Sequence, residues 1–236
     1  MQTVLVSVHI HSSSGTTIGA RRRRHGRRQT MASIGGFRAS YMDRLLGQLS
    51  LAVPPYGPNM TDLMHHVEFF DKNKDGIITL TESIQSFIAI GMEPAFATAT
   101  ATSTHATFGP LTTPPGKLPS MNIHVSHIHG AIHASDTGAY DRTGRFVPEN
   151  FEKIFKKHSH IKRDALAWWE VEEMLIANRD LLNPLSWPPA ELEWQVIYML
   201  GKDRFGYLHK DTVRGVYDGT VFPKLANRSL TLHSEV

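Results

Sequence analysis

A short run of polar residues contains the oxygen ligands that a calcium ion requires, at the spacing of an EF-hand loop. Counting Asp71 as position 1, oxygen-bearing side chains stand at positions 1, 3, 5 and 9, glycine at 6 and Glu82 at 12. Calcium takes roughly six to eight hard oxygen ligands, and the glycine permits the sharp turn that gathers them. The predicted ligands are the side chains of Asp71, Asn73, Asp75 and Glu82, the Ile77 carbonyl, and a water held by Thr79. The pattern predicts one calcium ion at residues 71–82.

Histidine is the second residue type in this chain that could do chemistry. The 236 residues include 14 histidines and no cysteine, which excludes disulfides and thiolate metal sites. Imidazole is then the obvious ligand for a transition metal or for haem iron. Four of these side chains crowd into residues 124–133, namely His124, His127, His129 and His133.

The geometry of this histidine cluster depends on the local backbone. A helix would place His129 and His133 on one face, whereas an extended chain would place His127 and His129 on one face. Hydrogen-bonded or exposed structural histidines are the alternative, which the spacing alone favours slightly. Spacing alone therefore does not decide between a metal site and a structural cluster.

The elements that would position these groups are helices on either side of the calcium-type loop. Residues 59–70 have helical periodicity, and residues 82–91 continue as the helix that leaves the loop. The apolar face of the first helix is formed by Leu63, His66, Val67 and Phe70. We therefore expect His66 to face the core and His65 to be turned away from it.

The rest of the chain is expected to be mainly helical. Prolines are expected to prevent long regular structure in residues 92–120, and residues 121–129 look strand-like or irregular. Further helices are predicted at residues 41–51, 148–157, 168–178, 188–201 and 210–217. The predicted fold is mainly α, with EF-hand-like helix–loop–helix units and a few short strands that pair across their loops.

Two other loops have part of the calcium pattern. In residues 141–146 and 203–208, a glycine aligned with position 6 places Asp141 and Asp203 at position 3, but no carboxylate falls at position 12. We interpret both as degenerate EF-hand loops that pair structurally with the loop at 71–82. Weak ion binding is the alternative.

The charge is unevenly distributed along the chain. The net charge is +3, and residues 1–30 contain six arginines and no acids, which leaves residues 31–236 at +3 − 6 = −3. We expect a disordered basic N-terminal arm at 1–40, a folded domain at 41–225 and a C-terminal tail at 226–236. The acidic folded part argues against a nucleic-acid partner.

No segment predicts an anchor. The first ten residues lack the basic region of a secretory signal, and no stretch approaches the roughly 18 consecutive apolar residues of a membrane-spanning helix. If the alanine- and threonine-rich stretch after the calcium-type loop meets a membrane, we expect it to lie on the surface, because it is a poor candidate to cross.

Several separated motifs follow one another in a fixed order along the chain. They are residues 65–78 with the calcium-type loop, residues 128–146 with Ile-His-x-x-x-His and Asp-Thr-Gly, residues 150–155, residues 177–180, Glu193-Trp194 and residues 217–219. Together they resemble the caleosins, the calcium-binding peroxygenases of plant and fungal lipid bodies. The resemblance covers about residues 60–225, and we expect a fungal caleosin-like protein.

The resemblance implies an enzyme with bound calcium and haem b. In this family histidines hold the haem, and oxygen passes from a fatty-acid hydroperoxide to an unsaturated lipid or another acceptor. Carried over to this chain, His66 and His133 are the expected iron ligands and catalytic residues, with His129 in support. Calcium at Asp71 would then fix the helix that carries His66.

The resemblance also implies a peripheral position on the cytosolic face of a lipid droplet or of the endoplasmic reticulum. Its expected partners are lipid hydroperoxides and unsaturated fatty acids, and self-association into a homo-oligomer is left open. The family usually has an apolar membrane-associating stretch with a proline knot, whereas residues 95–105 here are weakly apolar. The alternative function is a non-catalytic calcium-binding protein that associates with lipid droplets as a structural or interaction partner.

Overall fold

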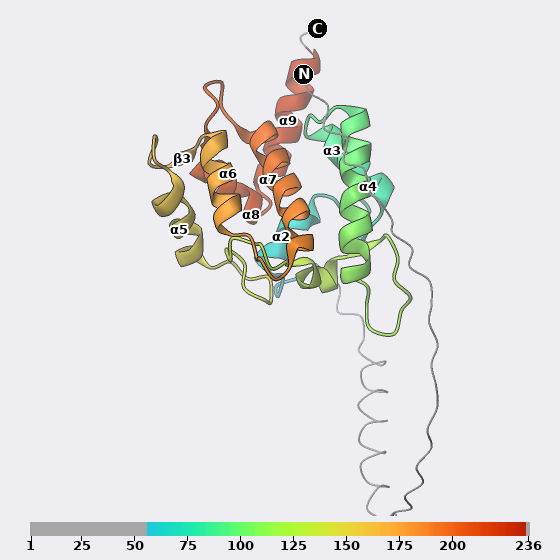
Figure 1. The fold of residues 1–236 in the computed structure, drawn as a ribbon. Coiled ribbons are helices and arrows are strands. Elements are labelled where there is room, and N and C mark those ends of the chain that lie inside the picture. The colour runs from blue at the N-terminus through green and yellow to red at the C-terminus, as the bar shows by residue number, and fades with distance from the viewer. Residues whose placement is uncertain (1–55, 235–236) are drawn as a thin grey trace, which may run out of the picture. The chain divides into compact units, whose positions relative to one another are not determined.

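A computed structural model describes residues 56–234 of the chain, which are mainly helical with a few short strands (Figure 1). The basic arm predicted at 1–40 and the helix predicted at 41–51 lie outside the described residues. The α-helices are α2 (Asp62–Glu68), α3 (Leu80–Ala89), α4 (Pro94–Leu111), α5 (Pro148–His158), α6 (Trp168–Ala177), α7 (Trp187–Gly201), α8 (Lys210–Tyr217) and α9 (Val221–Ser234). Two 3-10 helices, η1 (Val125–Ala131) and η2 (Pro184–Ser186), lie between them.

Short antiparallel strands join the helices in two pairs. The strands are β1 (Ile77–Ile78), β2 (Ile123–His124), β3 (Ala165–Leu166) and β4 (Leu208–His209). In the first pair Ile78 lies opposite Ile123, and in the second Leu166 lies opposite Leu208. Each strand leads directly into a helix, so the chain forms two pairs of helix–loop–strand–helix units.

This pairing corrects the predicted partners of the calcium-type loop. Its strand β1 pairs with β2, and neither of the two loops predicted to be degenerate EF-hands contributes that partner. The loop at 203–208 pairs through β4 with β3, which the sequence reasoning had not identified. The loop at 141–146 is instead closed on itself by a bridge between Tyr140 and Phe146, because Asp141 satisfies the loop's own backbone amides at Thr143 and Arg145.

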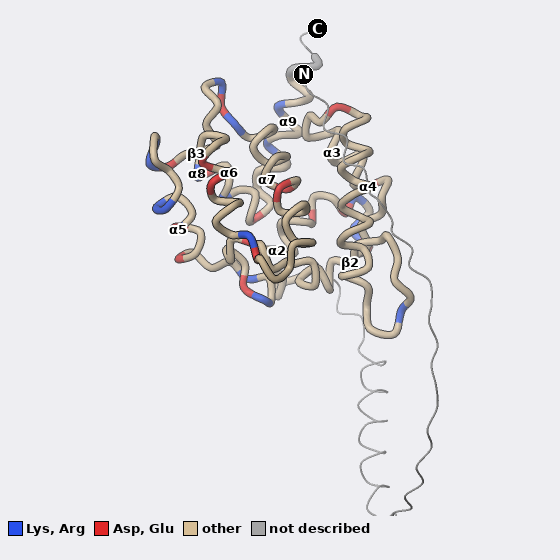
Figure 2. The backbone as a smooth tube through the Cα atoms, in the orientation of Figure 1, with Lys and Arg blue, Asp and Glu red and all other residues tan. Residues whose placement is uncertain are grey.

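The longest helix, α4, also differs from the expectation. Residues 92–120 were predicted to lack long regular structure, yet α4 runs for 18 residues. Pro94 occupies its first turn, where no N–H is needed, and Pro110 falls in its last turn, so neither proline interrupts the middle of the helix. Only residues 92–93 and 112–120 keep the predicted irregular form. Figure 2 shows that α4 carries no charged residue along its length.

Two hydrophobic clusters form the core, one around each pair of units. Tyr140 and Ile197 pack against both clusters and join them. The first contains Leu63, Phe70, Ile78, Ile123, Ile128, Val216 and Phe222, and the second contains Phe151, Phe155, Leu166, Val171, Met174, Trp194 and Leu208. Helix α9 packs on the first cluster through Leu225, so the domain boundary predicted at 225 falls inside a helix.

Candidate functional site

The loop at 71–82 has its oxygen side chains turned inward around a tight backbone. Gly76 adopts φ +85°, which glycine tolerates, and its N–H donates to Asp71 Oδ2 at 2.7 Å. Asn73 Oδ1 accepts from the Asp75 N–H at 3.0 Å, and Asp75 Oδ1 accepts from the Ile77 N–H at 2.8 Å. The side chains at positions 1, 3 and 5 therefore lie along one curved segment.

Glu82 closes this loop from the start of α3. Its Oε1 accepts from the N–H groups of Lys72 and Asn73 at 3.2 and 3.4 Å. Its Oε2 accepts from the backbone and the hydroxyl of Thr79 at 2.9 and 2.7 Å, which forms a capping box for the helix. Buried though it is, the Glu82 carboxyl has a lowered pKa, because these hydrogen bonds outweigh the effect of burial.

The residues present fit a calcium ion. Asp71 is fully buried, and its Oδ1 has no hydrogen-bond partner, so one strong acceptor is left for a cation. Its Oδ2 accepts from the Tyr56 hydroxyl, and this contact together with burial raises the tyrosine pKa. Within residues 56–234 no ready-made cluster of three or more His, Asp or Glu side chains surrounds a metal-sized space. With Glu82, the ligand set of an ion here would be completed by the predicted groups of Asn73, Asp75 and Thr79 and by the Ile77 carbonyl.

A second glutamate occupies the same place in the loop at 159–170. The Oε1 of Glu170 accepts from the N–H groups of His160 and Ile161 at 2.6 and 3.0 Å, and its Oε2 accepts from the Ala167 N–H at 2.7 Å. This matches the Glu82 pattern position by position. However, the loop has serine, isoleucine and arginine at positions 1, 3 and 5, so it lacks a calcium ligand set. The sequence signal that could have found it is Glu170 at the start of a predicted helix.

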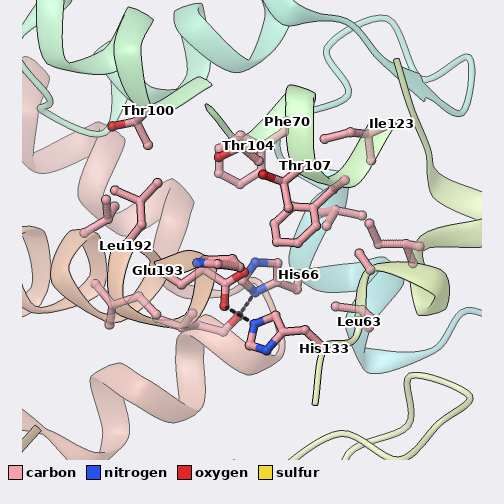
Figure 3. A pocket seen from close by; sticks show the side chains of 18 of the residues that line it. Leu63, His66, Phe70, Thr100, Thr104, Thr107, Ile123, His133, Leu192 and Glu193 are labelled. Carbon is pink, nitrogen blue, oxygen red and sulfur yellow. Dashed lines mark hydrogen bonds and ion pairs between the residues drawn. The ribbon is translucent and has the colours of Figure 1, made fainter. Parts of the chain in front are cut away.

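The helices on either side of the calcium-type loop, α2 and α3, line an apolar cavity of about 300 Å³. Leu63 and Val67 line it from α2, as the helical pattern predicts, Phe70 lines it from the residues just after α2, and Phe87 lines it from α3. Other walls come from α4, α7, α8 and the connection after η1. Figure 3 shows His66, Glu193 and His133 gathered on one side of this cavity.

His66 faces the cavity, and its ring orientation is fixed. Its Nδ1 lies 2.7 Å from the Val216 carbonyl oxygen, so Nδ1 carries the proton and donates it. The edge of the ring packs against Phe222 with centroids 5.2 Å apart. Burial lowers the pKa of His66 and keeps the imidazole neutral. Its Nε2 is then a free lone pair, which is the arrangement of a metal-binding histidine held by a backbone carbonyl. His65 is exposed and contacts Glu68, as expected.

His133 reaches the same cavity from the chain that follows η1. Its Nε2 lies 3.4 Å from Glu193 Oε2, and its Nδ1 is buried without a partner. Burial lowers the pKa of His133, but the contacts with Glu193 and the charge of Asp136 outweigh it and raise the pKa. Burial, followed by the charge of Glu193, raises the pKa of the Asp136 carboxyl. Sequence reasoning gave Glu193 no role at this site, because 60 residues separate it from His133.

His129 is not brought to this site. It is exposed, and its ring stacks on His127 with centroids 6.3 Å apart. The helical geometry that would align His129 with His133 is interrupted, because η1 ends at Ala131 and Ile132 adopts an extended backbone. Of the three histidines predicted to act together, the structure places only His66 and His133 around the cavity.

The histidines at the cavity fit the iron of a haem in chemical terms. His66 offers a neutral Nε2 against apolar walls, and His133 offers Nδ1 on the same side. Imidazole ligands and a water-poor pocket are what protein-bound haem iron requires. His66 is the readier ligand of the two, because Glu193 favours the protonated form of His133.

Comparison with known proteins places the chain in a family. Residues 58–226 match the family model described as caleosin related protein. The chain is 45% identical over 166 residues to "Probable peroxygenase 4" of Arabidopsis thaliana, covering 69% of this chain and 84% of that protein. It is 39% identical over 184 residues to "Peroxygenase" of Lilium longiflorum, covering 71% of this chain and 70% of that protein.

A third relative has a different name. The chain is 41% identical over 92 residues to "Probable inactive peroxygenase-like protein" of Arabidopsis thaliana, covering 39% of this chain and 44% of that protein. All three relatives are plant proteins, so they give no support to the expected fungal affiliation. No solved structure matches the chain. The family match spans most of the described residues, and the chain therefore belongs to the caleosin family.

Proposed function

We propose that this protein is a calcium-binding haem peroxygenase that transfers oxygen from a fatty-acid hydroperoxide to an unsaturated lipid or another acceptor. The observation that carries the proposal is the position of His66 and His133 on one side of an apolar cavity whose wall includes the helices of the calcium-type loop. Family membership and the relatives named peroxygenase support an oxidoreductase.

In this proposal His66 is the first iron ligand. The Val216 carbonyl holds its Nδ1 proton and directs Nε2 into the cavity. His133 can act as a second ligand once Glu193 or solvent has taken its proton, because only the neutral imidazole binds a metal. Haem bound there would supply the oxygen-transfer chemistry, while the apolar walls would orient the lipid and exclude water.

Calcium has a positional role in this proposal. The loop at 71–82 joins α2, which carries His66, to α3, and both helices line the cavity. An ion bound by Asp71 and Glu82 would fix the angle between these helices. It would therefore support the orientation of His66 without contacting the substrate.

The proposed partner surface is a lipid monolayer or bilayer that the protein touches from one side. No helix among residues 56–234 has both the length and the apolar character needed to cross a membrane. Three leucines in the connection between α6 and α7 are strongly exposed: Leu181 at 79%, Leu182 at 96% and Leu185 at 86%. Pro188, Pro189 and Leu192 follow them in sequence and line the cavity, so a lipid held at these leucines would lie next to it.

The test of the proposed function is an absorption spectrum combined with an oxygen-transfer assay. We expect the purified protein, supplied with haem, to show a Soret band and hydroperoxide-dependent sulfoxidation. His66→Val should remove both, and His133→Val should shift the band and lower the activity at least about tenfold. His65→Val is the matched control, because that histidine is the next residue of the same helix and is exposed.

A colourless protein after haem supplementation would contradict the enzyme. The alternative, a non-catalytic calcium-binding protein at lipid droplets, would then be favoured. One relative carries the name of an inactive peroxygenase-like protein, which gives this alternative a precedent in the family. Calcium binding at residues 71–82 is common to both functions.

A further inference from the structure

Helix α4 brings a row of hydroxyl groups to an otherwise apolar cavity. Thr100, Ser103, Thr104 and Thr107 recur at i, i+3, i+4 and i+7, so they share one face of the helix, and all four line the cavity. In Figure 3 the threonines lie on the side of the cavity opposite His66, Glu193 and His133. A ligand between these two sides would contact both.

Thr100 is the unusual member of this row. Its side chain is 4% exposed, and its Oγ1 has no hydrogen-bond partner among the described residues. Thr98, Thr102 and Thr107 instead donate their hydroxyls to the carbonyl oxygen four residues earlier, which is the usual arrangement for a helical threonine. A buried hydroxyl without a partner disfavours folding unless a ligand or water satisfies it.

The helix that carries these hydroxyls is held in place by buried contacts. His105, fully buried on α4, lies 2.8 Å from Ser83 Oγ of α3 through Nε2, and its Nδ1 contacts the Met121 carbonyl. Gly109 packs so closely on residues 120–121 that a Cβ would stand 2.4 Å from the Ser120 carbonyl oxygen. The hydroxyl row is therefore presented by a fixed wall of the cavity.

The cavity lining restricts the kind of oxygen group that could bind to this row. No lysine or arginine lines the cavity, while Asp136 and Glu193 do. A carboxylate beside the hydroxyl row would therefore meet no lysine or arginine, in a cavity that already holds two acidic side chains. Thr107 has committed its hydrogen to the Ser103 carbonyl and can only accept, whereas Thr100 can donate and accept. The best match is a neutral group that has its own O–H.

We propose that Thr100 and Thr104 form a binding subsite for a hydroxyl or hydroperoxyl group on an otherwise apolar lipid chain. The two residues stand one helical turn apart, about 6 Å along α4, so one O–H group can reach either of them. The inference rests on the proposed function, because it assumes that a lipid enters this cavity. It adds that the protein distinguishes an oxygenated chain from its plain counterpart.

The test compares two fatty acids that differ by one hydroxyl. Dissociation constants for ricinoleic acid and oleic acid are measured by displacement of a fluorescent fatty acid from the haem-supplemented full chain. We expect the wild type to prefer ricinoleic acid, and Thr100→Val to reduce that preference about three- to tenfold while leaving oleic acid binding unchanged. Thr104→Val should have a smaller effect in the same direction.

Thr102→Val is the matched control, because Thr102 is an exposed threonine of the same helix and its hydroxyl is bonded to Thr98. It should leave the preference intact. The melting temperature of ligand-free Thr100→Val should equal or exceed that of the wild type, since valine removes an unsatisfied hydroxyl. A lowered melting temperature would show that the hydroxyl serves the fold, and would overturn the subsite.

The remaining outcomes separate the inference from the proposed function. Equal affinity of the wild type for the two acids, or an equal effect of Thr100→Val on both, overturns the subsite while the lipid cavity stands. A wild type that binds neither acid overturns the lipid cavity and the subsite together. An unchanged Soret band in Thr100→Val would show that a lost preference does not come from lost haem.

Discussion

Glu82 and Glu170 occupy equivalent places in two different loops, and the comparison shows what each carboxylate does. Both accept backbone N–H groups from the start of their loop with one oxygen, and from the residue before the helix with the other. Only the loop of Glu82 has a buried acceptor left over, the Oδ1 of Asp71. Glu170 therefore has a structural role alone, whereas Glu82 is available to an ion.

This comparison predicts opposite responses to calcium. In thermal unfolding followed by circular dichroism, saturating calcium should raise the melting temperature of the wild type, because it binds only the folded state. Glu82→Gln should abolish that rise. Glu170→Gln should lower the melting temperature equally with and without calcium, by the equivalent of about 1–3 kcal/mol for a lost buried acceptor, and should keep the rise. A calcium response that survives in Glu82→Gln would place the ion elsewhere.

For single residues, the sequence predicts the direction of a side chain well where one helix contains the whole periodic pattern. The inward direction of His66 follows from the periodicity of α2 alone. The site beyond α2 was less predictable. His129 and His133 do not lie on one face, because the backbone becomes extended at Ile132. The hydrogen-bond partner of His133 is Glu193, which is distant in sequence and comes near only in the folded chain.

The turn between α8 and α9 is the element that holds α2 in position. Gly219 has φ +78°, and a Cβ on it would stand 2.3 Å from the carbonyl oxygen of His65 and 3.3 Å from the Cα of His66. The helix with the proposed iron ligand thus lies directly against a glycine backbone. Only glycine allows this approach.

Gly219→Ala should therefore displace α2. We expect a loss of stability above about 2 kcal/mol in chemical denaturation, together with weaker haem binding in a titration that follows the Soret band. Gly116→Ala is the matched control, because Gly116 has φ +82° but no atom within 4 Å of its added Cβ. The Gly116→Ala variant should lose only about 1 kcal/mol of stability, because alanine is disfavoured in a left-handed backbone, and it should keep its haem affinity. Equal effects of the two variants would show that the contact with α2 is unimportant.

Helix α4 shows where element prediction failed. Its prolines and its alternating alanines and threonines indicated an irregular connection. However, Pro94 lies in the first turn and Pro110 only one residue before the end of the helix, and burial of Ala97, Ala101 and His105 stabilises the rest. Single-sequence periodicity does not detect this, because a helix with small residues on its buried face has little hydrophobic contrast.

For the molecule as a whole, the notable surface feature is a set of exposed leucines in the connection that precedes α7, whose first residues line the cavity. The loop with Leu181 and Leu182 is held by a hydrogen bond from the Trp187 indole N–H to the Asp180 carbonyl, and by one from the Asp180 N–H to Ser135. The leucines are thus held in an ordered turn. A fixed exposed apolar loop is unfavourable in water and favourable at a lipid surface.

Replacing Leu181, Leu182 and Leu185 by serine should weaken binding to phospholipid-coated triacylglycerol droplets at least about tenfold in a flotation assay, because three buried leucines are lost from the lipid phase. Leu230→Ser is the matched control, since Leu230 is an exposed leucine on α9. The spectrum of the triple variant should stay normal. Undiminished flotation would show that another surface meets the lipid.

The overall class was predictable from the sequence, and the arrangement of the units was not. Helical periodicity and the complete loop at 71–82 indicate a mainly helical chain with short paired strands. Strand β2 lies within residues 121–129, which are expected from the sequence to be strand-like or irregular. The loops before β2 and β3 lack the calcium pattern, however, so the sequence does not show which loops pair. Pairing between loops far apart in sequence depends on the packing of the helices around them.

The pairing of β1 with β2 ties the calcium-type loop to the segment that follows α4. Besides the two strand partners, the Val125 N–H donates to the Gly76 carbonyl at 3.0 Å. A one-residue insertion or deletion in either segment would shift this register and turn Ile78 or Ile123 away from the core. The calcium-type loop and the segment around β2 therefore cannot change length independently during evolution. Among natural relatives we expect only substitutions in these two segments, and we expect insertions and deletions to fall in the irregular residues 112–120.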